Sequence, residues 1–154
     1  DVAKRLQKYL TNGGYKVVMT RSDDTYISLD GRVKYALDHG ADIFISIHVN
    51  SYTGESGHGT ETYYYNGGSN ITESKKLASF MEERLLDAMN TTDRGVKTAA
   101  YRVLKANTLP ATLVELAFIT NSNDAKKLGS ATYRDKAAKA LYLGVQDYYK
   151  WLGK

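Results

Sequence analysis

The most constraining feature of this sequence is a nearly continuous apolar run, Ile43 to Ile47, inside the segment Asp42–His48. A strand with one face in solvent would alternate apolar and polar residues, whereas this run is interrupted only by Ser46. Such a pattern is typical of a strand that is buried on both faces, as in a parallel sheet covered by helices. The run therefore predicts the centre of such a sheet.

Helical and β-rich segments alternate along the chain, which is the order expected of an α/β domain. Apolar residues recur at helical spacing in four places, and the glycines at 13, 14 and 40 end the first two helices. The expected helices cover residues 2–10, 28–39, 77–88 and 137–152, and the expected strands cover 15–20, 42–48, 60–65, 101–105 and 112–117, with a loop at 51–59 and a turn at 93–95. We predict one domain over residues 1–154, a three-layer α/β/α fold with a mostly parallel central sheet.

Composition excludes several classes of function. The chain has no cysteine, so it has no disulfide framework, thiolate metal site or thiol nucleophile. No stretch approaches eighteen uninterrupted apolar residues, so we expect no membrane span. The net charge of +4 is compatible with anionic partners, such as cell-wall polymers or nucleic acid, and does not distinguish between them. Because the basic residues are spread along the chain rather than gathered into a tract, they do not predict a nucleic-acid partner.

Two polar residues, His48 and Glu115, close apolar strand patterns. Functional groups of open α/β sheets gather at the carboxyl ends of strands, so we expect the two side chains to lie across one crevice. A histidine and a glutamate placed there could form a metal centre with a general base. A hydrogen-bonded structural histidine and an ion-paired glutamate are the alternatives, and residue spacing alone favours these alternatives.

Other possible sites have less support. His39 falls at a helix end and His58 in a glycine-rich loop, so we expect both to be exposed rather than metal ligands. The glycines at 54, 57 and 59 are not followed by the Lys-Ser or Lys-Thr pair of a phosphate-binding loop. The tyrosines at 63–65 and 148–149 could stack on bases or sugars, but alternation in a strand and packing in a helix explain them better. No substrate-binding residue is assigned.

Six strings, taken together, resemble the zinc-dependent type 3 family of N-acetylmuramoyl-L-alanine amidases in order and spacing. The resemblance runs from about residue 1 to residue 150. The strings are Thr20-Arg21 with Asp24, Ser28-Leu29 with Arg32, Ser-Ile-His-Val-Asn at 46–50, Gly-Thr-Glu-Thr-Tyr-Tyr at 59–64, Arg-Gly-Val-Lys at 94–97, and Pro110-Ala111 through Val114-Glu115 to Phe-Ile-Thr-Asn at 118–121. The glycine that the family usually has before the phenylalanine is Ala117 here.

The resemblance implies a peptidoglycan hydrolase that cleaves the amide between N-acetylmuramic acid and L-alanine of the stem peptide with a zinc-activated water. It implies that Glu115 is the catalytic glutamate and that His48 is a zinc ligand. The family's other two ligands are a histidine in an Asp-Pro-Gly-His-Gly-Gly motif and a glutamate that opens the first helix. Both would precede Asp1, so we expect the domain to be N-terminally incomplete.

The same resemblance predicts a secreted autolysin, a monomer that acts on peptidoglycan in the cell wall, outside the cell or in the periplasm. The alternative is a catalytically inactive wall-binding module, because two of the zinc ligands are absent from this chain. Only residues 66–72 separate the third helix from the strand before it, which is too few for a helix that could block the site. We therefore expect an uncovered site.

Overall fold

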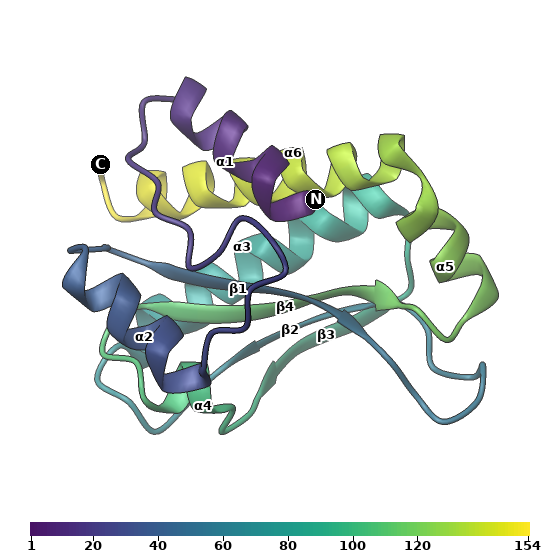
Figure 1. Ribbon diagram of the computed structural model, residues 1–154, viewed down its shortest axis with the longest axis horizontal. Coiled ribbons are helices and arrows are strands. Elements are labelled where there is room, and N and C mark those ends of the chain that lie inside the picture. The colour runs from purple at the N-terminus through teal and green to yellow at the C-terminus, as the bar shows by residue number, and fades with distance from the viewer.

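The computed structural model describes residues 1–154, and its centre is a four-stranded sheet with the order β1-β4-β2-β3 (Figure 1). Strand β4 (Ala111–Phe118) pairs in parallel with β1 (Phe44–Asn50) and antiparallel with β2 (Thr60–Tyr64), and β2 pairs in parallel with β3 (Asp93–Thr98). The sheet is mostly parallel, as predicted. The run that ends at His48 was expected at its centre, but β1 is an edge strand in which only Phe44 and Ser46 are buried. Seven of the eight residues of β4 are buried, which explains the apolar composition of this central strand.

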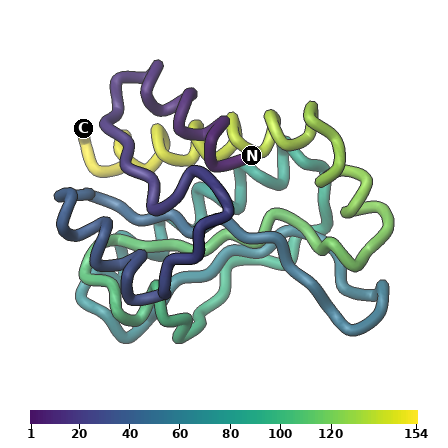
Figure 2. Tube along the Cα trace, in the orientation of Figure 1, coloured from purple at the N-terminus to yellow at the C-terminus, as the bar shows by residue number.

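Helices cover both faces of the sheet and give the predicted three layers (Figure 1). One face carries α1 (Val2–Asn12), α3 (Ile71–Met89) and α6 (Ala131–Trp151), the other carries α2 (Leu29–Asp38) and α4 (Arg102–Lys105), and α5 (Ser122–Gly129) follows the end of β4. The chain trace places both termini on the α1 and α6 side (Figure 2). None of these helices combines the length and apolarity needed to cross a membrane.

The larger core lies between the sheet and the α1, α3 and α6 layer. Leu77 and Met81 of α3 and Leu141 of α6 have no exposed surface. Gly144 permits the close contact of α6 with α3, because a Cβ atom at this position would lie 2.9 Å from Sδ of Met81. On the opposite face a smaller cluster joins α2 and α4 to the beginnings of β1 and β4. The opposite face is therefore packed at one end only.

Two of the predicted strands are wrong. Residues 15–20 form no strand, because no other part of this chain pairs with their backbone, although Tyr15 and Val17 still pack against the larger core. Residues 101–105 contain the short helix α4, in which the carbonyl of Tyr101 accepts hydrogen bonds from the backbone of Leu104 and Lys105. This turn of helix buries the neighbouring pair Val103 and Leu104, which a strand would have placed on opposite faces.

Strand β3 and helix α5 were not predicted from the sequence. The expected turn at 93–95 exists, because Asp93 accepts a hydrogen bond from the backbone of Gly95 at 2.7 Å and Gly95 has a φ of +80°. It lies inside β3, at a shift in the register with β2, so a bulge produced the turn signal. Helix α5 was not predicted at all. Its N-cap is Asn121, whose side chain accepts hydrogen bonds from the backbone of Asn123 and Asp124.

Glu82 of α3 is a buried acid on the densely packed face of the sheet. Only 4% of the residue is exposed, and neither of its carboxyl oxygens has a hydrogen-bond partner. Burial, reinforced by the negative charge of Asp93, raises the pKa of Glu82 to about 7. The neutral acid is therefore the form that the folded protein favours.

This environment predicts a pH-dependent effect of Glu82→Gln on stability. An acid whose pKa is higher in the folded than in the unfolded state makes the free energy of unfolding decrease as pH rises from about 4.5 to about 7. The amide stays neutral, so we expect the variant to exceed the native protein by about 2–3 kcal/mol at pH 8 and by little at pH 5. Urea denaturation at both pH values measures this difference. The exposed neighbour Glu83, changed to Gln, is the control, and an equal effect of Glu82→Gln at both pH values would contradict the prediction.

Candidate active site

His48 and Glu115 lie side by side on one face of the sheet. They are register partners in the parallel β1 and β4 pair, so their side chains point to the same face from strands about 4.8 Å apart. The expected proximity is present, but its location differs from the expectation. Glu115 lies within β4, which continues to Phe118, and His48 lies two residues before the end of β1. The pair is therefore on the open face of the sheet rather than beyond its edge.

The incomplete cover of this face leaves the pair accessible. Phe44 and Leu113, which precede His48 and Glu115 on the same face, are buried in the cluster with α2 and α4. That cluster does not reach His48 and Glu115, which are both partly exposed. The connection from β2 to α3, residues 65–70, contains no helix, as its length predicted. The site is thus not covered from this connection.

The surroundings of His48 favour its neutral imidazole form. Its Nε2 atom lies 3.1 Å from the hydroxyl of Ser46, two residues earlier on the same face. Burial, together with the positive charges of Arg32 and Arg21, lowers the pKa of His48. A neutral imidazole at neutral pH can accept a proton or donate an electron pair to a metal ion.

Glu115 has the environment of a general acid–base residue. Its Oε2 atom is buried and has no hydrogen-bond partner in the protein. Burial, and then the negative charge of Glu61, raises the pKa of Glu115 to about 7. The ion pair that was the structural alternative is absent, because no lysine or arginine forms a salt bridge with Glu115. A carboxyl group with this pKa can both take and return a proton near neutral pH.

Glu61 is a site residue that sequence reasoning did not single out. It is the register partner of Glu115 in the antiparallel β2 and β4 pair, and only 3% of it is exposed. Oε1 accepts hydrogen bonds from Asn50 at 2.8 Å and Tyr63 at 2.7 Å, and Oε2 accepts them from Arg94 at 2.8 Å and Lys97 at 2.5 Å. Burial opposes ionisation, but these donors outweigh it, so the pKa of Glu61 is lowered. Glu61 is a fixed anion beside Glu115.

The signal for Glu61 lies in pairing rather than in local sequence. Its string, Gly59 to Tyr64, alternates like an ordinary strand, and a glutamate there suggests an exposed position. Only the antiparallel register of β2 with β4 places it in line with Glu115 and His48. This register is a long-range property of the fold.

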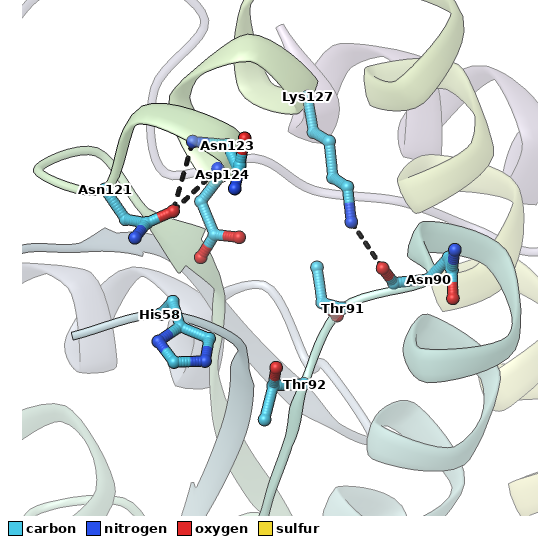
Figure 3. A pocket seen from close by; sticks show the side chains of 8 residues that line it. All are labelled: His58, Asn90, Thr91, Thr92, Asn121, Asn123, Asp124 and Lys127. Atoms are coloured by element: carbon cyan, nitrogen blue, oxygen red, sulfur yellow. Dashed lines mark hydrogen bonds between the residues drawn. The ribbon is translucent and has the colours of Figure 1, made fainter. Parts of the chain in front are cut away.

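The other two histidines do not join this row. His39 and His58 are exposed, as expected. His58 lines a cavity of about 280 Å³, in which all eight lining residues are polar and neither His48 nor Glu115 takes part (Figure 3). The polar groups there largely satisfy one another: Lys127 donates to the Asn90 carbonyl and Asn121 caps α5. This cavity offers a structural network and no catalytic pair.

The residues of this chain do not complete a metal site. No group of three histidine, cysteine, aspartate or glutamate side chains converges at any point. His48 has Glu115 beside it, and the next carboxylate in the row, Glu61, already accepts four hydrogen bonds. A catalytic zinc needs three protein ligands with an open fourth position, and this set does not provide them.

Fold and site together define a three-layer α/β domain that presents a partly buried glutamate with a raised pKa beside a histidine with a lowered pKa on an open sheet face. The family profile described as N-acetylmuramoyl-L-alanine amidase matches residues 1–147. The chain belongs to the N-acetylmuramoyl-L-alanine amidase family.

Individual relatives support this assignment. The N-acetylmuramoyl-L-alanine amidase LytC of Bacillus subtilis (strain 168) is 45% identical over 150 residues, which cover 97% of this chain and 30% of LytC. The catalytic domain of the amidase CwlV from Bacillus (Paenibacillus) polymyxa var. colistinus superposes with a TM-score of 0.89 at 32% identity, covering 97% of this chain and 81% of that chain. The amidase of Clostridium difficile 630 gives a TM-score of 0.90 at 33% identity, with coverage of 97% and 80%. The chain thus spans under a third of the length of LytC.

The row of carboxylates predicts that Glu61 controls the acidity of Glu115. In Glu61→Gln the neighbouring negative charge is gone while Arg94 and Lys97 keep theirs, so we expect the pKa of Glu115 to fall below about 7. Titration of the Glu115 carboxyl carbon by NMR measures the change, with Glu83→Gln as the distant control. A pKa of Glu115 that stays unchanged or rises would show that burial alone sets it.

Proposed function

We propose that this chain is the catalytic part of a peptidoglycan hydrolase that cleaves the amide between N-acetylmuramic acid and L-alanine of the stem peptide. The observation that carries the proposal is the position of Glu115, a partly exposed acid with an unpartnered buried oxygen, in register with His48 on an open sheet face. Membership of the amidase family gives the substrate class. The proposal assigns Glu115 as the catalytic residue and His48 as the residue that faces the same substrate atoms.

The chemistry that Glu115 provides is proton transfer. As a carboxylate it takes a proton from the water whose oxygen forms a bond with the amide carbonyl carbon. As a carboxylic acid it returns that proton to the amine nitrogen when the carbon–nitrogen bond breaks. One water is consumed and Glu115 is regenerated. A pKa of about 7 allows both transfers at neutral pH.

Zinc is part of the proposal through the family resemblance, which makes His48 one of its ligands. When bound, zinc would polarise the amide carbonyl and make the attacking water more acidic. His48 is the residue of this chain that would hold it, and the chain does not form a complete ligand set. The alternative is a wall-binding module without activity, and membership of the amidase family does not favour it. Release of soluble muropeptide products by the protein at its natural length separates the two, since a binding module retains peptidoglycan and releases nothing.

We further propose that the protein is secreted and acts as a monomeric autolysin in the cell wall. Its proposed substrate lies outside the cytoplasmic membrane. The net charge of +4 favours contact with anionic wall polymers there.

The first test is Glu115→Gln in the natural-length protein supplied with zinc. Gln is close to Glu in size, so packing on β4 is kept, while the proton acceptor is lost. General acid–base catalysis typically contributes about a hundredfold to ten-thousandfold, so turnover of muropeptides should fall at least about a hundredfold. Unchanged circular dichroism and metal content serve as controls. A variant that keeps nearly native turnover would make Glu115 a structural residue.

His48→Ala tests the second role. If His48 is a metal ligand, bound zinc and turnover should decrease together, because a ligand is removed. Metal analysis by mass spectrometry, beside a muropeptide assay, measures both. His39→Ala is the matched control, because His39 is exposed at the end of α2 and away from the row. Native zinc content in His48→Ala would remove His48 from the ligand set.

A further inference from the structure

Arg94 is held in a fixed orientation at the β3 side of the row formed by His48, Glu115 and Glu61. Its Nε atom donates to Glu61 Oε2 at 2.8 Å, and its guanidinium carbon lies 4.9 Å from the centre of the Phe118 ring. Hydrogen bonding from one side and the aromatic ring from another limit the rotamers of a long side chain. Both Nη groups have no hydrogen-bond partner in the protein, and 35% of the side chain is exposed. The free half of the guanidinium is therefore rigid and accessible.

The backbone explains this orientation. Glu61 lies opposite the register shift in β3, between the pairs Thr60 with Asp93 and Thr62 with Val96. Arg94 is in the bulge that this shift creates, and Gly95 supplies its positive φ. Bulges commonly redirect a side chain next to a functional site. Here the bulge turns Arg94 toward Glu61, on the face that carries Glu115.

The charge at this point is not balanced within the protein. Glu61 is the only carboxylate that forms salt bridges with Arg94 and Lys97. The three side chains together therefore carry a net charge of one positive unit. Lys97 directs its ammonium at Glu61, whereas Arg94 uses only Nε for that contact. The two remaining nitrogens of a guanidinium form a planar pair of donors that fits a carboxylate. An anionic group of a ligand is the partner that suits them.

The distance from Glu115 limits which ligand atom this can be. Glu115 is on β4 and Arg94 on β3, with β2 between them, so their strands are about 10 Å apart. In a peptide, the backbone nitrogen of one residue and the α-carboxyl carbon of the next are about 6 Å apart. The guanidinium of Arg94 reaches over β2 to Glu61, the register partner of Glu115, so it lies closer to Glu115 than the strands do. A ligand group one residue beyond the cleaved amide is within its reach. The matching group is a carboxylate on the residue after the one whose amide is cleaved.

We propose that Arg94 binds the free α-carboxylate of the second residue of the stem peptide, and that Glu61 and Phe118 position Arg94 for this contact. The inference rests on the proposed function, in which Glu115 acts on the amide of the first residue, L-alanine. A stem whose second residue is a glutamate joined through its γ-carboxyl group has such a carboxylate, and amidation converts it to a neutral carboxamide. Arg94 therefore makes the protein selective for the carboxylate form.

The experiment compares kcat/KM for two muropeptides that differ only in this group, a carboxylate or a carboxamide, with the natural-length protein. We expect the native protein to prefer the carboxylate by about tenfold to a hundredfold, the range for a charge-assisted hydrogen-bonded pair. In Arg94→Gln the preference should disappear, because kcat/KM falls for the carboxylate substrate and changes little for the carboxamide. Arg94→Lys, which keeps the charge but not the planar pair of donors, should lie between the two.

The ratio of the two kcat/KM values does not depend on how much of a variant is folded, so partial unfolding cannot imitate the result. Arg84→Gln is the matched control, because Arg84 pairs with Asp147 between α3 and α6 on the opposite face of the sheet. Dipeptides that consist of the first two stem residues, with the carboxylate or the carboxamide, give a second readout. Their affinity, measured by NMR titration, needs no turnover. Equal cleavage of both substrates by the native protein would overturn the role of Arg94 and leave the proposed function intact. Cleavage of neither would overturn the proposed function and, with it, this inference.

Discussion

The pairing of β4 with two neighbours of opposite direction is the constraint on which the site depends. Its parallel register with β1 places Glu115 beside His48, and its antiparallel register with β2 places Glu61 on the other side. A shift of one residue in either register would turn a side chain to the opposite face, into the core under α3 and α6. The apolar residues that alternate with these three polar ones hold the register, since Val114 and Leu116 are fully packed on that core. Core packing and site geometry are therefore the same property of the sheet.

Much of this could be predicted from the sequence, because the relevant signals are local. The apolar run before His48 correctly predicted a strand, and helical spacing predicted α1, α2, α3 and α6. The central position that the run suggested was wrong, because β1 is an edge strand and β4 and β2 are the central ones. The proximity of His48 and Glu115 followed from two strand patterns and a parallel sheet. What was missed depends on pairing or on capping: residues 15–20 have strand composition but no partner, and β3 begins with a bulge that has the composition of a turn. Glu61 was missed because its function depends on a neighbour 54 residues away in sequence that only the fold provides.

The two carboxylates of the row have opposite environments, and this difference separates their functions. Both lie on the same face and are register partners, about 5 Å apart at Cβ. Glu61 has four donors and keeps its charge, whereas Glu115 has a buried oxygen without a partner and holds its proton more tightly. The fixed negative charge of Glu61 raises the pKa of Glu115, because a second negative charge nearby is unfavourable. One strand pair thus provides a permanent anion and a titrating acid.

A buried carboxylate such as Glu61 costs several kcal/mol of desolvation, which ion pairs and hydrogen bonds offset only when their geometry is good. Apolar residues that replaced Glu61 together with its two cationic partners would commonly give an equally stable sheet. The charge therefore calls for an explanation other than stability. It keeps two cations in place near Glu115, and one of them, Arg94, retains an unused pair of donors stacked beside Phe118. Replacing Glu61 alone by an apolar residue would leave Arg94 and Lys97 without their acceptor and would release Arg94. The buried charge of Glu61 therefore serves to hold a guanidinium still at the edge of the row formed by His48, Glu115 and Glu61.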